Sequence, residues 1–206
     1  MPRRALALVG MVALGVTLIG TVAATRDSPQ RDPAASPYRG SAAPPGIKLP
    51  SFRLPRSDGG LLSSQQTAGK IVVATFVDSA CKEKCPIIVG VVGRALPLLT
   101  QAEQAEVVPL AFSVNPRVDT PARVQRFLAE RGASRLVYLV GTVQAMQPLW
   151  KEFGILSAVA SGSSDVHSAG VRVFDRRGEW VSTLRVGLDL TPQNLVHDIR
   201  EALKRS

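Results

Sequence analysis

The 206-residue sequence contains few of the residue types on which many binding sites depend. It has two cysteines and two histidines, and aromatic residues make up 5% of the chain. Lysine and arginine outnumber aspartate and glutamate by 25 to 16, but they are scattered and do not alternate with aromatic residues. Because single-stranded nucleic acids are bound by basic grooves whose aromatic side chains stack on the bases, we expect no nucleic-acid partner.

Cysteine is also absent near the N-terminus, which excludes a lipid-modified cysteine after the apolar start of the chain. Two arginines precede a run of apolar and small residues that extends to residue 24. About 20 such residues can span a bilayer as a helix, and a basic start keeps the N-terminus inside. Residues 1–24 therefore predict a membrane anchor, with a cleavable signal segment as the alternative. We expect the rest of the chain on the extracytoplasmic face of the cytoplasmic membrane, or secreted or periplasmic if the segment is cleaved.

Two composition zones follow the apolar start. Residues 25–46 are polar, rich in proline and without periodicity, which predicts an extended linker. Residues 47–206 alternate between apolar runs and turn signals, and they are numerous enough to enclose one hydrophobic core. The sequence thus predicts an anchor or signal, a linker and one folded domain.

The folded domain is expected to alternate strands with helices. Continuous apolar, β-branched runs predict buried strands at 71–77, 107–114 and 136–140. The segments at 86–101, 120–131, 142–153 and 192–204 are predicted to be helices. Glycine turns predict a hairpin near the start, at 52–62, and a second one at 171–186. This order predicts an α/β, thioredoxin-like three-layer fold: a central mixed sheet flanked by helices, with an N-terminal hairpin.

The two cysteines follow the first buried strand, at the sheet edge where ligands bind in open α/β folds. Pro86 suits the first turn of the next helix, so that Cys85 is expected to cap it. A thiol at a helix N-terminus has a lowered pKa, and Lys82 and Lys84 add positive charge. We therefore expect a thiolate, the form that binds soft metals and exchanges disulfides.

Three residues separate Cys81 from Cys85, one more than in a redox thioredoxin motif. The pair can close a structural disulfide, which is the default for two cysteines in an exported protein. A zinc site of four protein ligands would need both histidines or carboxylates as well. Copper(I) is satisfied by two thiolates and one imidazole, so both a metal site and a disulfide remain open.

His167 is the candidate third ligand, because it lies in the loop before the strand that starts near residue 171. Its alternative is an ordinary surface histidine. His197 is expected to complement the dipole of the last helix instead. Thioredoxin-fold oxidoreductases place a proline before the strand that faces their cysteines, but no proline occurs between Pro148 and Pro192. This favours metal binding over dithiol turnover.

These residues resemble the Sco/SenC family of thioredoxin-like copper-binding proteins over about residues 48–204. The matching blocks are Phe52-x-Leu54 with Gly69-Lys70, Cys81-x-x-x-Cys85-Pro86, Ser113 to Pro116 with Asp119 to Pro121, Leu139 to Gly141, Phe153-Gly154 and His167-Ser168. The sequence departs from the family at Lys82 to Lys84, where proline and aspartate are usual, and at Asn115, where aspartate is usual. It also carries Asp165 two residues before His167, whereas the family has aspartate directly before its histidine.

The resemblance implies that Cys81, Cys85 and His167 bind copper, as Cu(I), Cu(II) or both. The protein would deliver copper to, or prepare, the CuA site of a cytochrome c oxidase subunit, or serve another copper protein. Asp78 and Asp165 are candidates to orient the histidine, or are ordinary loop-capping residues. This makes the protein a metallochaperone rather than an enzyme, and no catalytic residue is assigned. The alternative is a thiol-disulfide oxidoreductase with Cys81 and Cys85 as its redox pair, whereas a thiol peroxidase lacks a clear arginine and hydroxyl beside Cys81.

Overall fold

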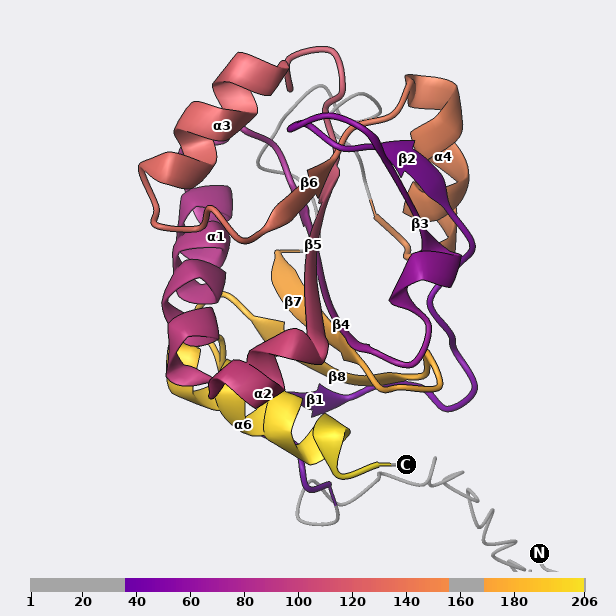
Figure 1. Ribbon diagram of the computed structural model, residues 1–206, viewed down its shortest axis with the longest axis vertical. Coiled ribbons are helices and arrows are strands. Elements are labelled where there is room, and N and C mark those ends of the chain that lie inside the picture. Colours follow the sequence, from indigo (N-terminus) through magenta and orange to yellow (C-terminus); the bar gives the residue numbers. More distant parts are fainter. Residues whose placement is uncertain (1–35, 156–168, 206) are drawn as a thin grey trace, which may run out of the picture. The chain divides into compact units, whose positions relative to one another are not determined.

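A six-stranded mixed sheet organises the chain (Figure 1). The computed structural model describes residues 36–155 and 169–205, within a compact unit that spans Asp32–Ser206. The sheet order is β1-β8-β7-β4-β5-β6, in which β4, β5 and β6 are parallel and β7, β8 and β1 each pair antiparallel with their neighbour. The strands are β1 (Ser41–Ala42), β4 (Ile71–Val77), β5 (Val107–Ser113), β6 (Val137–Leu139), β7 (Gly170–Phe174) and β8 (Trp180–Arg185).

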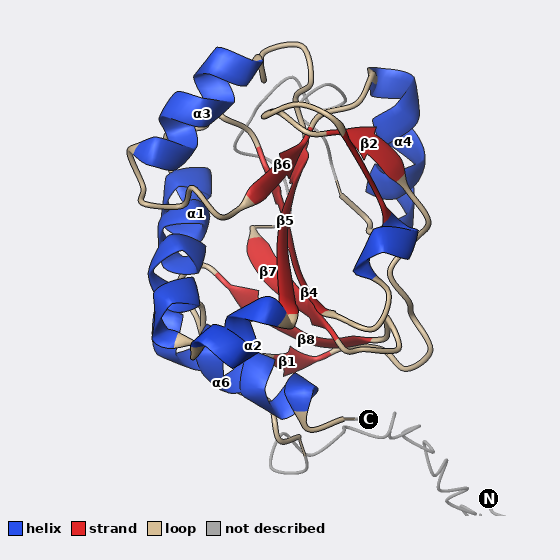
Figure 2. Cartoon of the chain, viewed as in Figure 1, coloured by secondary structure: helices blue, strands red, loops and turns tan. Residues whose placement is uncertain are grey.

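Helices cover both faces of this sheet, which confirms the predicted three-layer α/β fold (Figure 2). The helices are α1 (Lys84–Ala95), α2 (Gln101–Ala105), α3 (Pro121–Ala129), α4 (Val143–Glu152) and α6 (Pro192–Leu203), with 3-10 turns η2 (Ser64–Thr67) and η3 (Leu96–Leu98). α1, α3 and α6 lie on one face, and α4 lies on the other beside the hairpin of β2 (Arg53–Pro55) and β3 (Leu61–Ser63). The N-terminal hairpin is therefore also confirmed.

β4 is central because both of its faces are apolar. Ile71, Val73 and Val77 pack into the core beneath α1, α3 and α6, whereas alternate residues such as Phe76 pack into the core beneath α4. Successive side chains of a strand point to opposite faces, so a continuous apolar run supplies two cores at once. The end of β4 is thereby fixed between two packed layers, and the cysteine loop starts at that end.

The helix predicted at 86–101 is divided in the structure. α1 begins two residues earlier, at Lys84, and a 3-10 turn at Leu96–Leu98 then separates it from α2. Pro97 lacks a backbone N–H and cannot continue the helix in regular form. Thr100 restarts the chain as an N-cap, and its side chain forms a capping box with Glu103.

β1 lies within the stretch that the sequence analysis took for a linker. Ser41 and Ala42 pair with Thr183 and Ser182 of β8. The backbone N–H groups that precede β1 donate to the buried Asp198 carboxylate of α6, from Arg39 at 2.7 Å and Gly40 at 3.0 Å. Residues 36–42 are thus attached to the folded unit rather than extended and solvated.

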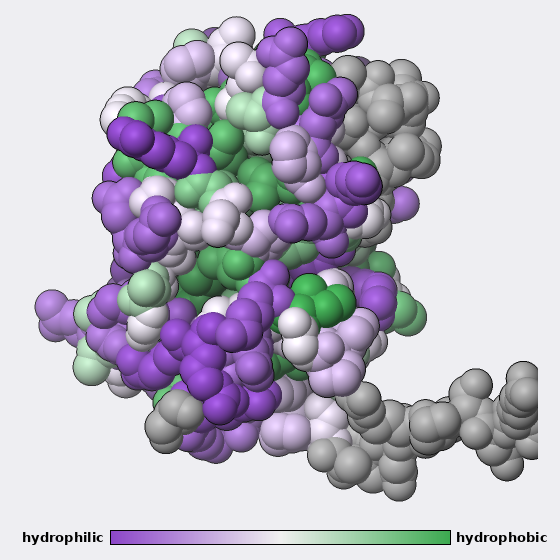
Figure 3. All heavy atoms as spheres, turned by 90° about the vertical axis from the view of Figure 1, so that its right-hand side faces the viewer, coloured by the Kyte–Doolittle hydropathy of each residue, from purple (hydrophilic) through white to green (hydrophobic). Residues whose placement is uncertain are grey.

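The remaining strands and helices agree with their predicted positions to within a few residues. In the part of the chain that the structure describes, no helix is long and apolar enough to cross a bilayer. The expected anchor at 1–24 and the first part of the expected linker lie outside that part. The face that carries α4 and the hairpin is largely hydrophilic, with small apolar patches between the polar side chains (Figure 3).

Candidate metal site

The loop between β4 and α1 holds both cysteines. It begins with a tight turn in which the Cys81 N–H donates to the Asp78 carbonyl at 3.2 Å. The Asp78 carboxylate accepts from the Ala80 N–H at 2.7 Å, an arrangement typical of aspartate-stabilised turns. The turn places Cys81 close to the first residues of α1.

The turn and the helix bring the two sulfur atoms together. The Cys85 N–H points at the Cys81 Sγ at 3.4 Å, and the Asp78 N–H points at the Cys85 Sγ at 3.5 Å. Both side chains are buried, with 4% of Cys81 and 0% of Cys85 exposed. Two of the three predicted ligands therefore converge at the end of β4.

The predicted lowering of the Cys85 pKa is wrong. Glu83 is the N-cap of α1, so Cys85 lies inside the first turn rather than at the cap. A hydrogen bond with the Cys81 side chain, together with burial, raises the pKa of the Cys85 thiol. The Asp78 N–H acts in the opposite direction but is the smaller effect. Packing thus outweighs the helix N-terminus in favouring the protonated thiol.

The buried carboxylate of Asp119 holds the cysteine loop through hydrogen bonds with Ser79. Asp119 accepts from the Ser79 N–H at 2.9 Å and its hydroxyl at 2.5 Å, from the Ser113 hydroxyl at 2.5 Å and from the Tyr138 hydroxyl at 2.8 Å. Burial raises the pKa of Asp119, although these donors oppose the rise. The residue connects β5, β6 and α3 to the cysteine loop. Sequence reasoning gave it no role, and the only signal was its place in the block that starts at Ser113.

Asp78 supports the loop through a second contact. Its buried carboxylate accepts from the Asn115 side-chain amide at 2.9 Å. An amide can donate at this position, whereas a second carboxylate would face Asp78 with like charge. The departure from the family pattern at Asn115 is therefore accommodated by a new hydrogen bond. The backbone N–H of Asp78 points at the Cys85 Sγ.

The predicted residues of the loop before β7, His167 and Asp165, lie outside the described residues. His197 is half-buried on α6, and its Nδ1 lies 3.2 Å from an oxygen of Asp198. In residues 36–155 and 169–205, no three side chains of histidine, cysteine, aspartate or glutamate form a group able to hold a metal. Among the predicted ligands, the described residues thus bring together the two cysteine sulfurs.

The family follows from a comparison of the whole sequence with protein-family models. The model described as SCO1/SenC matches residues 41–204. This chain belongs to the SCO1/SenC family. No curated protein matches the sequence. The family match starts at β1 and includes both cysteines, so this family member carries its sulfur pair inside the matched domain.

Solved structures match this family member along most of their length. Copper-bound ScoI of Bradyrhizobium japonicum is 22% identical, with a TM-score of 0.65, and the match covers 76% of this chain and 100% of that one. Yeast Sco1 is 23% identical, with a TM-score of 0.66, over 79% and 98%. BsSco, described with a disulfide switch and as a member of the Sco family of cytochrome c oxidase assembly proteins, is 22% identical, with a TM-score of 0.65, over 79% and 96%. These similarities show the thioredoxin-like fold.

Proposed function

We propose that this protein binds copper outside the cytoplasm with Cys81, Cys85 and His167, and delivers it to, or prepares, the CuA site of cytochrome c oxidase. The observation that carries the proposal is the convergence of the two cysteine side chains at the end of β4. Membership of the SCO1/SenC family and the copper-bound state of the Bradyrhizobium relative support it. Residues 1–24 would tether the domain to the membrane or direct its export.

The chemistry of the site fits copper. Two cysteine sulfurs within hydrogen-bond reach of one another form a soft donor set, which Cu(I) prefers over oxygen ligands. The imidazole of His167 would complete a three-ligand site of the kind that suits copper better than zinc. The hydrogen bonds that Asp119 accepts from Ser79 hold the turn that carries Cys81. The protein would thus supply two sulfur ligands held in place by the loop, and copper would be the cargo.

A thiol-disulfide oxidoreductase is the second candidate. The proximity of Cys81 and Cys85 favours it, as does the disulfide switch described for BsSco. This activity needs both cysteines but makes no use of His167. The histidine therefore distinguishes the two functions.

The deciding experiment measures Cu(I) affinity by competition with a chromophoric chelator, using the reduced chain of residues 36–206. This range includes β1 and its contacts with α6. We expect one copper per chain. His167→Ala should weaken binding by about 100-fold or more, because the loss of even an outer-shell partner costs a metal site about 10–100-fold. His197→Ala is the matched control and should leave the affinity unchanged.

Either of two results contradicts the proposal. Binding that is indifferent to His167 would remove the histidine from the site. Weak binding by the wild type, together with rapid disulfide exchange in the His167→Ala variant, would identify the oxidoreductase instead.

A further inference from the structure

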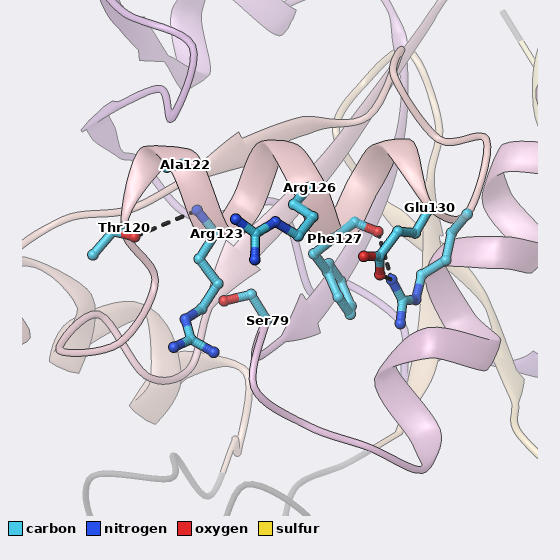
Figure 4. A pocket seen from close by; sticks show the side chains of 8 residues that line it. Ser79, Thr120, Ala122, Arg123, Arg126, Phe127 and Glu130 are labelled. Atoms are coloured by element: carbon cyan, nitrogen blue, oxygen red, sulfur yellow. Dashed lines mark hydrogen bonds and ion pairs between the residues drawn. The ribbon is translucent and has the colours of Figure 1, made fainter.

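A pocket of about 400 Å³ opens beside the cysteine loop (Figure 4). Its wall is the exposed side of α3 and the turn that follows it, and Ser79 of the cysteine loop closes one side. Ser79 is two residues before Cys81, so their Cα atoms are separated by at most about 7 Å. The lining residues are Ser79, Thr120, Ala122, Arg123, Arg126, Phe127, Glu130 and Arg131.

The positive charge in this pocket is only partly neutralised. Arg131 pairs with Glu130 at 2.9 Å, and its guanidinium stacks on the Phe127 ring at 4.3 Å from the centroid. Arg123 and Arg126 are exposed, and within the described chain neither guanidinium has a hydrogen-bond or ion-pair partner. Figure 4 shows both side chains extending from α3 on the side where Ser79 lies. Two arginines are therefore available to an anion that enters the pocket.

The carboxylate that lines the pocket, Glu130, pairs with Arg131 and not with Arg123 or Arg126 in the described chain. Asp119, directly before α3, is buried and accepts from Ser79, Ser113 and Tyr138. On the other side of Ser79, the cysteine loop exposes Lys82, Glu83 and Lys84, which together carry one net positive charge. The surface around the sulfur pair is thus basic on both sides, in a chain whose net charge is +9. Such a field attracts an acidic partner and speeds its approach.

The spacing of the arginines suits an extended acidic peptide. Arg123 and Arg126 are three residues apart on a helix, which separates their Cβ atoms by about 5–6 Å. Side chains on one face of an extended chain repeat about every 6.6 Å, so alternate carboxylates of a bound segment can each meet one guanidinium. Arginine binds a carboxylate through two parallel hydrogen bonds, which fixes the orientation of the segment.

We propose that this pocket binds an acidic segment of the protein that exchanges copper or electrons with Cys81 and Cys85. The inference rests on the proposed function for its purpose, but the binding itself does not depend on copper. The segment would be anchored by Arg123 and Arg126, and the partner's metal ligands or cysteines would meet the loop beyond Ser79. Glu130 would limit the acidic stretch at the far end, because it repels further carboxylates.

The test uses the full-length chain without copper and a fluorescein-labelled peptide in which glutamate alternates with serine. Fluorescence anisotropy at low salt should detect binding that weakens as salt screens the exposed charges. Arg123→Gln and Arg126→Gln should each weaken binding about fivefold, the effect of one exposed ion pair worth about 1 kcal/mol. Arg53→Gln is the matched control, because Arg53 is an exposed arginine on β2, beside α4 on the other face of the sheet.

The outcomes separate this inference from the proposed function. Weakening by the two α3 variants but not by Arg53→Gln supports the pocket. Equal weakening by all three would overturn it in favour of diffuse charge attraction. Displacement of the peptide by inorganic phosphate, at a concentration where succinate has no effect, would also overturn it and indicate a phosphate site. Cu(I) affinity, measured on the same variants, should not change, so a failure of copper binding remains a separate result.

Discussion

Cys85 is fully buried at the end of β4, and its surroundings favour the protonated thiol. Burial and the hydrogen bond with Cys81 raise its pKa above the ordinary value for cysteine. A thiol must lose its proton before it binds a metal, so copper would have to displace this proton at the proposed site. At neutral pH, copper binding at the proposed site would therefore release a proton.

This environment predicts that Cu(I) affinity rises with pH. Below the raised pKa of Cys85, each displaced proton should increase the apparent affinity by about tenfold per pH unit. Chelator competition between about pH 7.5 and 9, where an ordinary histidine is already neutral, measures the cysteine contribution alone. An affinity that stays constant over this range, after correction for the chelator, would show that Cys85 is already ionised.

At the residue scale, the sequence identified Cys81 and Cys85 because their spacing and their place after a buried strand are local features. The pKa of Cys85 depends on packing between β4 and α1, which no local pattern reports. Asp119 was missed for a similar reason, since its partners come from three separate parts of the chain. The His167 prediction stays a prediction, because its loop lies outside the described residues.

At the scale of elements, α1 approaches the end of α3 through a glycine. A Cβ at Gly93 would lie 2.9 Å from the carbonyl oxygens of Arg131 and Gly132, which are backbone atoms with little freedom to move. The same helix contains Gly90, where a Cβ would meet only the flexible end of the Arg94 side chain at 3.1 Å. The two glycines therefore differ in what surrounds them, although they share a helix.

We expect Gly93→Ala to destabilise the protein by about 2 kcal/mol, as overpacking does elsewhere. The melting temperature should fall by roughly 4–8 °C in a domain of this size. Gly90→Ala is the control and should be neutral or stabilising, because alanine favours a helix over glycine by about 1 kcal/mol. Thermal unfolding followed by circular dichroism measures both. Equal effects of the two substitutions would rule out the close approach at Gly93.

Elements with a local sequence signal were predictable, whereas an element that is stabilised by a distant part of the chain was not. β4 and β5 were found because continuous β-branched and apolar runs report a buried strand locally. β1 was not found, because Ser41 and Ala42 carry no strand signal and are held by β8. The division of the helix after Ala95 could have been read from Pro97 and the Thr100 capping box.

At the scale of the whole molecule, Asp198 joins the two ends of the described chain. Its buried carboxylate accepts from the N–H groups of Arg39 and Gly40 and from the Ser182 hydroxyl at 2.5 Å. Removal of a charged acceptor leaves such buried donors unsatisfied, at a cost of about 1–3 kcal/mol each.

Asp198→Ala should therefore lower the free energy of unfolding by about 3 kcal/mol. The melting temperature should fall by roughly 6–12 °C. Amide hydrogen exchange should increase at residues 39–42 before it increases in β4, because β1 loses its attachment first. Asp58→Ala, at an exposed ion pair with Arg56, is the control and should change little. Unchanged protection of β1 in the Asp198→Ala variant would contradict this role.

The attachment of β1 also fixes the end of the domain at which the described chain begins. In Figure 1, β1 and α6 lie at the lower end of the view, whereas α3 lies at the upper end. Ser79 of the cysteine loop is bonded to Asp119, directly before α3, so the loop belongs to that upper end. The described chain thus enters the domain at the sheet edge formed by β1, away from the cysteine loop. Within the described residues, the cysteine loop and the arginine pocket therefore lie at the end of the domain opposite to β1, where a partner can approach them without meeting that strand.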